Sequence, residues 1–168
     1  MKKILFPHTP IDDITVSSIL NTIGRKLTLT FTVKGDLQNY TFPKEQTIKR
    51  ANELWKATCF ELFLANSKKD EYYELNFSPS LAWNFYYLKY YRAEVQEVEI
   101  VAEPTVQIRE DKNSYSIELT LEGFDFERFD SCNLTAIFLT QEGERTFWSI
   151  QPMKESPDFH HRDYFVAL

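Results

Sequence analysis

The chain has little glycine, no long apolar run and no excess of positive charge, and each shortage excludes a class of protein. It has four glycines among 168 residues, and neither GxGxxG nor GxxxxGK(S/T) occurs, so glycine-rich phosphate-binding loops are excluded. No apolar run approaches the ~18 residues that a membrane-spanning helix needs. The 25 acidic residues outnumber the 19 basic ones, so the chain gains no counterion-release energy from a phosphate backbone. We therefore expect neither nucleic acid nor a membrane as a partner.

Cysteine usage and the first residues bear on the compartment. Cys59 and Cys132 are far apart in sequence, each lies in a strand-like run, and no CxxC spacing occurs. We expect two buried free thiols, with a disulfide or a metal site as the less favoured alternative. The N-terminus begins like a signal peptide, but Pro7 ends its apolar stretch after the three residues Ile4–Phe6, whereas a secretory core needs ~7–15. The expected location is cytoplasmic.

What the chain does have is alternation of apolar and polar residues with period two, which is typical of strands with one buried face. The clearest runs are 27–33, 58–65, 73–78 and 114–121, with further strand-like runs at 133–140, 145–151 and 164–168. The segment 110–113 is predicted to be a hairpin loop. We expect one domain, residues 1–168, with an all-β fold: an antiparallel, jelly-roll-like β-sandwich.

Helical character is scarce. Residues 11–23 have partly helical spacing, although their Thr, Val and Ser content weakens that prediction. Residues 46–54 are predicted to form one or two turns. The fold class therefore includes one or two short helical turns and no more.

Three blocks rich in aromatic and polar residues are the candidates for function. The first is Arg50–Glu61, with the run LWKATCFE. The second is Tyr72–Ser80, YYELNFSPS, followed by Trp83, Tyr86 and the pair Tyr91-Arg92. The third is the Trp148 strand and the later segment PDFHHRD, Pro157–Asp163.

At these residues the chain resembles the bacterial DOMON-like family, over a stretch from about Arg25 to the C-terminus. The resemblance rests on LWxxTCFExF, on YYExNFSPS with a following Trp and a YR pair, and on a Trp strand ending in PDFHH. It implies a β-sandwich of the superfamily that includes DOMON domains and carbohydrate-binding module family 9, whose members bind sugars or haem. Leu81 and Ala82 depart from the pattern, since small residues or glycine usually precede the Trp.

Trp55 and Glu61 form the first candidate pair. An indole covers the apolar C–H face of a pyranose, and a nearby carboxylate accepts two hydroxyl protons. The alternative is a core tryptophan beside a glutamate that bonds within a turn. The resemblance implies the first interpretation, because in family 9 modules a Trp and a Glu at similar spacing line the sugar site.

Glu74, Asn76 and Ser78 share one face of a predicted strand. They are a candidate hydrogen-bonding floor for a ligand, or else an internal network or an exposed sheet face. Arg92 is predicted to pair with Glu61 or Glu74, which would order a site or brace the sheet.

His160, His161 and Trp83 are the remaining candidates. Adjacent strand residues point to opposite faces, and neither HxH nor HExxH occurs, so no metal site is predicted. In family 9 modules the comparable late loop supplies a second sugar-clamping Trp, and here Phe159, His160 and His161 occupy that stretch. Trp83 either packs in the core or lines a cleft.

These observations predict a non-catalytic domain that binds a small carbohydrate or related polyhydroxylated molecule. The predicted ligand-binding residues are Trp55, Glu61, Glu74, Asn76, Ser78, Trp83, Arg92, His160 and His161. Haem binding is the first alternative, with His160, His161, His8 or Met153 as axial donors. An interaction module that recruits a protein partner or a second copy of itself is another. Glycoside processing by paired carboxylates is the last, and requires a cleft that holds carboxylates with raised pKa values.

Overall fold

Strands make up nearly all the regular structure in this computed structural model, which describes all 168 residues. The strands are β1 (Lys2–Pro7), β2 (Ile14–Ile23), β3 (Lys26–Gly35), β4 (Lys49–Arg50), β5 (Cys59–Ala65), β6 (Tyr72–Phe77), β7 (Ala82–Tyr90), β8 (Ala93–Glu97), β9 (Thr105–Asp111), β10 (Ser114–Glu122), β11 (Ser131–Leu139), β12 (Arg145–Ser149) and β13 (Val166–Ala167). The helical content is two short 3₁₀ turns, η1 (Leu54–Lys56) and η2 (Arg162–Tyr164). The structure contains no helix with the length and apolarity that crossing a membrane takes.

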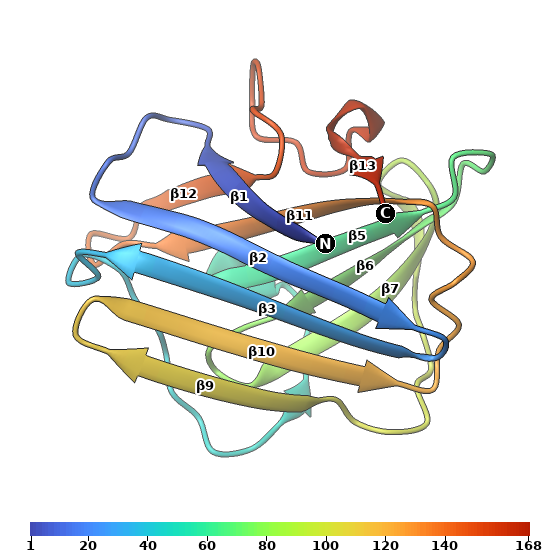
Figure 1. Cartoon of the computed structure of the whole chain (residues 1–168), viewed down its shortest axis with the longest axis horizontal. Coiled ribbons are helices and arrows are strands. Elements are labelled where there is room, and N and C mark those ends of the chain that lie inside the picture. Colours follow the sequence, from blue (N-terminus) through green and yellow to red (C-terminus); the bar gives the residue numbers. More distant parts are fainter.

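The strands form one curled sheet whose two halves face each other. The order is β4-β7-β6-β5-β11-β12-β1-β2-β3-β10-β9, with β8 added beside β7 and β13 beside β11. In Figure 1, β2, β3, β10 and β9 form the near layer, and β11, β5, β6 and β7 lie behind them. Strand β1 joins the halves, because Lys2–Leu5 pair with β2 while Phe6 and Pro7 pair with β12. The nearly all-β prediction is confirmed, whereas a jelly-roll arrangement is not established by this strand order.

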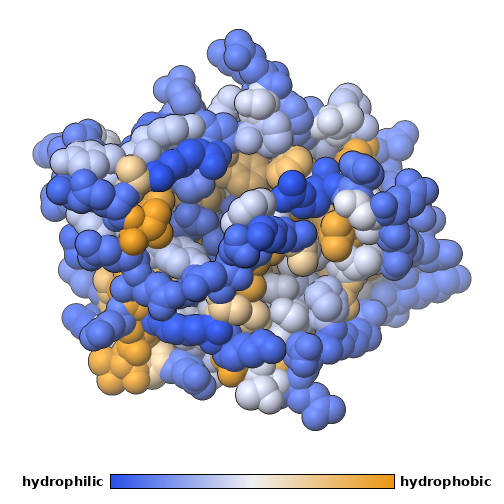
Figure 2. All heavy atoms as spheres, turned by 180° about the vertical axis from the view of Figure 1, so that it is seen from behind, coloured by the Kyte–Doolittle hydropathy of each residue, from blue (hydrophilic) through white to orange (hydrophobic).

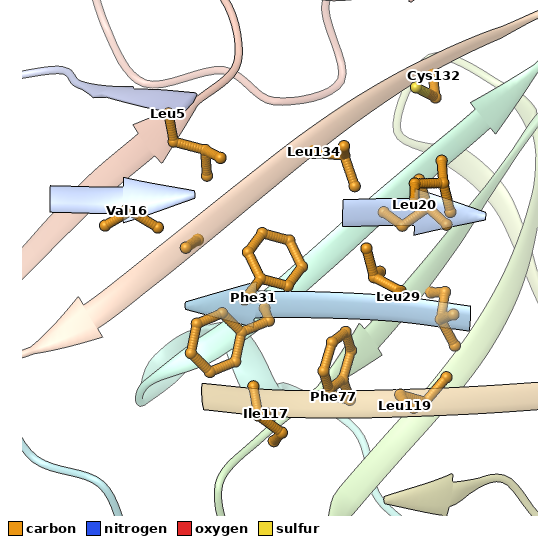
Figure 3. Packing of buried hydrophobic residues seen from close by; sticks show 14 of the residues in the cluster. Leu5, Val16, Leu20, Leu29, Phe31, Phe77, Ile117, Leu119, Cys132 and Leu134 are labelled. Carbon is orange, nitrogen blue, oxygen red and sulfur yellow. The ribbon is translucent and has the colours of Figure 1, made fainter. Parts of the chain in front are cut away.

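The main core fills the space between the two halves. A cluster of 29 buried hydrophobic residues lies there, drawn from inward positions on alternate residues of most strands. Figure 3 shows Phe31 of β3 and Phe77 of β6 reaching toward each other from opposite layers, with Ile117 and Leu119 of β10 beside them. The ring centroids of Phe31 and Phe77 are 5.9 Å apart. Period-two alternation thus places one face of each layer in a shared core.

The outer face of the β5–β7–β11 layer is partly buried as well. All seven residues of β5 are buried, on both faces. A second cluster on the outer side combines Phe63, Tyr72 and Leu88 with Met153 and Phe159 from the C-terminal segment. The expectation that one strand face stays free is therefore wrong for β5, because the chain after β12 folds back across it.

Both segments predicted as helical are different in the structure. Residues 14–23 form β2, in which Ile14, Val16, Ser18 and Leu20 face inward and are buried. Their β-branched side chains and the unbroken pairing with β3 favour the strand over a helix. Within 46–54, residues 49 and 50 pair with β7 as β4, and the 3₁₀ turn η1 begins only at residue 54.

Two local predictions are confirmed. Residues 112 and 113 form the turn of an antiparallel hairpin within the predicted loop 110–113, whose first two residues belong to β9. Cys59 and Cys132 are free, buried thiols.

Candidate functional site

A cavity of about 540 Å³ opens on the outer face of the β5–β7–β11 layer. Figure 2, which views the molecule from behind Figure 1, shows this face hollowed, with apolar atoms in the recess and hydrophilic side chains around it. Strands β5, β6, β7, β11 and β12 supply the floor, and the loop before β5, the β7–β8 hairpin and the C-terminal segment supply the walls. The lining residues are Asn52, Glu53, Trp55, Glu61, Glu74, Asn76, Tyr86, Leu88, Arg92, Val95, Ile137, Arg145, Phe147, Pro157, Phe159 and His160.

Three polar side chains form the centre of the floor. Glu61 on β5 lies directly opposite Asn76 on β6, and Glu74 is two residues from Asn76 on the same face. The side-chain Nδ2 of Asn76 donates to Oε1 of Glu74 at 2.7 Å. On the other side of β5, the hydroxyl of Thr135 donates to Oε2 of Glu61 at 3.1 Å. Strand register therefore brings Glu61, Glu74 and Asn76 together, whereas Ser78, the third residue of the predicted floor, is not part of it.

The two glutamates hold their protons more tightly than usual. Burial, together with the negative charge of Glu74, raises the pKa of Glu61 from 4.5 to about 8. Burial also raises the pKa of Glu74, to about 6, against the opposing effects of the Asn76 hydrogen bond and the positive charge of Arg92. Neither carboxylate has an ion-pair partner: the salt bridges of the chain involve other residues. Near neutral pH the coupled pair therefore carries about one negative charge.

Trp55 stands at the mouth of the cavity. It lies in η1, which follows Glu53, a non-glycine residue in left-handed backbone conformation with φ of 60°. Its side chain is 43% exposed, in contrast to the buried Trp83 and Trp148. The guanidinium of Arg145 lies 5.4 Å from the centroid of the indole and also donates to the carbonyl of Trp55. The indole is thus held in place while part of its surface stays open to solvent.

The opposite wall is built by a hydrogen-bonded network between the β7–β8 hairpin and the C-terminal segment. Arg92 forms an ion pair with Asp158 at 2.9 Å, and the Tyr91 hydroxyl donates to the same carboxylate at 2.6 Å. Burial alone would raise the pKa of Asp158, but these two hydrogen bonds hold it below its usual value. Arg92 itself has φ of 53°, a second strained position at the cavity. The predicted pairing of Arg92 with Glu61 or Glu74 is wrong, because Asp158 is the nearer carboxylate.

His160 is held in place by the same network. The Tyr72 hydroxyl accepts from the backbone N–H of Arg92 at 3.1 Å, so its own proton is free to be donated to Nδ1 of His160, 2.8 Å away. Burial and the positive charge of Arg92 lower the pKa of His160 to about 4, so the ring is neutral at physiological pH. Its Nε2 then carries the hydrogen and has no acceptor in the protein. His160 therefore contributes a donor to the cavity wall.

Three predicted site residues lie outside this cavity. Ser78 is buried beneath the sheet end, where its hydroxyl donates to the carbonyl of Thr58 at 2.9 Å. Trp83 belongs to the main core, because odd-numbered positions of β7 face inward. His161 caps η2, accepting from the backbone N–H of Asp163, and lines a separate polar hollow. Their assignment to a site shared with Trp55 is not supported by the geometry.

The remaining lining residues were not singled out as binding residues. Tyr86 follows the same outward phase as Asn76 on the neighbouring strand, and its hydroxyl donates to Asn52 at 2.6 Å. Strand alternation indicates the position of Tyr86, because it lies three residues after the core residue Trp83 and so points to the opposite, outer face. Phe147 and Arg145 carried no such signal, because only the long-range pairing of β12 with β11 brings them to the cavity.

The cavity does not fit haem. His160 is its only lining residue of an axial-donor type, whereas Met153 lies in the adjacent apolar cluster. The two carboxylates on the floor would repel the anionic propionates of haem, and they would be buried against its flat apolar macrocycle. The chain also contains no cluster of three or more His, Cys, Asp or Glu side chains arranged to hold a metal ion. What the arrangement offers is hydrogen-bond acceptors below, one donor at the side and an aromatic ring at the mouth.

Comparison with known proteins supports the fold. No sequence-family model and no curated protein matches the chain. The crystal structure of a "putative carbohydrate-binding protein" from Bacteroides uniformis matches 99% of this chain and 84% of its own, with a TM-score of 0.67 at 14% identity. Two structures of a family 9 carbohydrate-binding module from Caldicellulosiruptor kristjanssonii, in complex with cellotriose and with glucose, match 89% and 88% of this chain and 72% and 71% of their own, at TM-scores of 0.47 and 0.46 and 8% identity. The chain therefore shares its overall fold with the Bacteroides uniformis protein.

Proposed function

We propose that this chain is a non-catalytic binding module for a small carbohydrate or related polyhydroxylated molecule. The motif resemblance to DOMON-like and family 9 modules agrees with this proposal. So does the fold shared with the Bacteroides uniformis protein, which is described as a carbohydrate-binding protein. The ligand occupies the cavity on the outer face of the β5–β7–β11 layer.

The observation that carries the proposal is the convergence of an open indole and a polar floor on one cavity. Trp55 at the mouth offers a flat apolar surface to the C–H face of a sugar ring. Glu61, Glu74 and Asn76 below it accept hydroxyl hydrogens, and Nε2 of His160 donates to a hydroxyl or ring oxygen. A sugar ring presents both kinds of group at once, which a purely apolar or purely ionic ligand does not.

Isothermal titration calorimetry against a panel of mono- and disaccharides tests the proposal. We expect at least one sugar to bind at millimolar concentration or below, and Trp55→Ala to weaken it about ten-fold through loss of stacking. Phe6→Ala is the matched control, because Phe6 is 46% exposed, close to the 43% of Trp55, and does not line the cavity. Absence of binding heat for every sugar would contradict the proposal.

Catalysis is the second candidate, because the cavity holds two carboxylates with raised pKa values. Glu61 and Glu74 are diagonal neighbours on adjacent strands, a relation that separates residues by roughly 7–8 Å and their Cβ atoms by somewhat less. Glycoside hydrolysis needs two carboxyl groups that flank the scissile bond, whereas these two rise from the same floor. We therefore expect no release of nitrophenol from nitrophenyl glycosides, and measurable turnover that Glu61→Gln abolishes would establish the catalytic alternative.

A further inference from the structure

The floor of the cavity has more hydrogen-bond acceptors than donors. One oxygen of each glutamate, Oε1 of Glu61 and Oε2 of Glu74, receives no hydrogen bond from a nitrogen or hydroxyl of the protein. Asn76 is 2% exposed, and its Oδ1 is buried without a donor. Its Nδ2 already donates a hydrogen bond to Glu74. Oδ1 of Asn76 and Oε2 of Glu74 are thus left without a protein donor, while Glu61 beside them keeps its carboxyl proton up to about pH 8.

The negative charge on this floor is also left unbalanced by the protein. The positive charge of Arg92 lowers the pKa of both glutamates, but its guanidinium forms its ion pair with Asp158, at 2.9 Å. Arg145 stays at the mouth, where it packs over Trp55 and Phe147. A buried carboxylate without a cation partner gains more from a charged donor than from a neutral one.

A primary ammonium group matches both features. It carries three N–H donors, no acceptor and one positive charge. A hydroxyl carries one donor and no charge, so it satisfies fewer of these acceptors and does not balance the negative charge. An N-acetyl group keeps one N–H but removes the charge and adds a carbonyl acceptor.

We propose that the cavity selects an amino-substituted sugar, whose ammonium group binds on the floor between Glu61, Glu74 and Asn76 while the ring packs on Trp55. This inference rests on the proposed carbohydrate function and names the class of sugar within it. The ammonium pairs with the ionised carboxyl of the Glu61–Glu74 pair, and the carbonyl oxygen of the protonated carboxyl accepts a further N–H.

Calorimetric titration of the full chain with matched sugars tests the preference. The probes are glucose, glucosamine and N-acetylglucosamine, and the corresponding galactose and mannose sets, at about pH 6.5, below the ~7.7–8.0 pKa of an α-amino group. We expect the amino sugar of at least one set to bind about ten-fold or more tightly than its neutral parent, the ratio of one charge-assisted hydrogen bond. The N-acetyl sugar should show no such gain.

Glu74→Gln is the decisive variant, because it keeps the shape and the acceptor for Asn76 but removes the charge. We expect its ratio of amino-sugar to neutral-sugar affinity to fall toward one, whereas Glu142→Gln, an exposed position in the β11–β12 turn, keeps the wild-type ratio. Equal wild-type affinity for glucose and glucosamine, and likewise for the other pairs, would overturn the amino-sugar inference but leave the carbohydrate function standing. A wild-type ratio that survives in Glu74→Gln would overturn it as well. No binding of any sugar would instead refute the proposed function.

Discussion

Replacing Glu61 by glutamine is expected to change how the stability of the protein depends on pH. The folded state raises the pKa of Glu61 from 4.5 to about 8, so between these values the folded protein binds a proton that the unfolded chain lacks. The stabilisation from this proton is full below pH 4.5 and is lost as the pH rises to about 8. At ~1.36 kcal/mol for each pH unit, the carboxyl loses roughly 5 kcal/mol of stability across that window. The glutamine side chain of the Glu61→Gln variant would have the same shape with no proton to lose.

Urea unfolding at several values from about pH 5 to pH 9 measures this difference. Wild type should lose stability relative to Glu61→Gln as the pH rises, by several kcal/mol in total and with unchanged m-values, so that the variant becomes the more stable protein at the alkaline end. The exposed Glu142→Gln serves as the control and should follow wild type throughout. Parallel stability curves for wild type and Glu61→Gln would refute the reasoning that burial and Glu74 hold a proton on this side chain.

Three further outcomes are expected. Tyr72→Phe removes the hydroxyl that bridges a backbone N–H and Nδ1 of His160, so chemical denaturation should show a loss of about 1–3 kcal/mol. Phe31→Ala removes a fully buried ring that packs against two others between the layers, and thermal and urea unfolding should show a loss of about 3–5 kcal/mol, while a loss below about 1 kcal/mol would contradict the packing described. Cys59 and Cys132 are buried and burial raises the pKa of both thiols, so a disulfide-exchange reagent should label neither until urea unfolds the chain; labelling of the native protein would contradict their burial.

The floor of the site was predictable from sequence because local alternation determines it. Glu61 alternates with the core residues Phe60 and Leu62, and Glu74 and Asn76 alternate with Leu75 and Phe77. Antiparallel pairing that buries those apolar residues together brings the three polar residues to the opposite face. The same rule excludes Trp83, whose odd position on β7 points it into the core. The prediction of Trp83 as a binding residue is therefore wrong, because its position along the strand, and not its residue type, decides which face it reaches.

The walls were less predictable, because they come from chain segments far apart in sequence. Tyr72 meets His160 across 88 residues, and Arg92 meets Asp158 across 66. The fold-back of the C-terminal segment also explains why both faces of β5 are buried. The helical prediction for residues 11–23 failed for a related reason: pairing along the full length of β3 outweighs a weak local spacing.

The C-terminal segment forms part of the cavity wall, so the cavity depends on how this segment packs. Phe159 and His160 complete its wall, so the cavity forms only when the segment after β12 packs against the sheet. A bound ligand would then contact both this segment and the sheet, and would hold the two together. Ligand binding should therefore slow the cleavage of this segment by a protease.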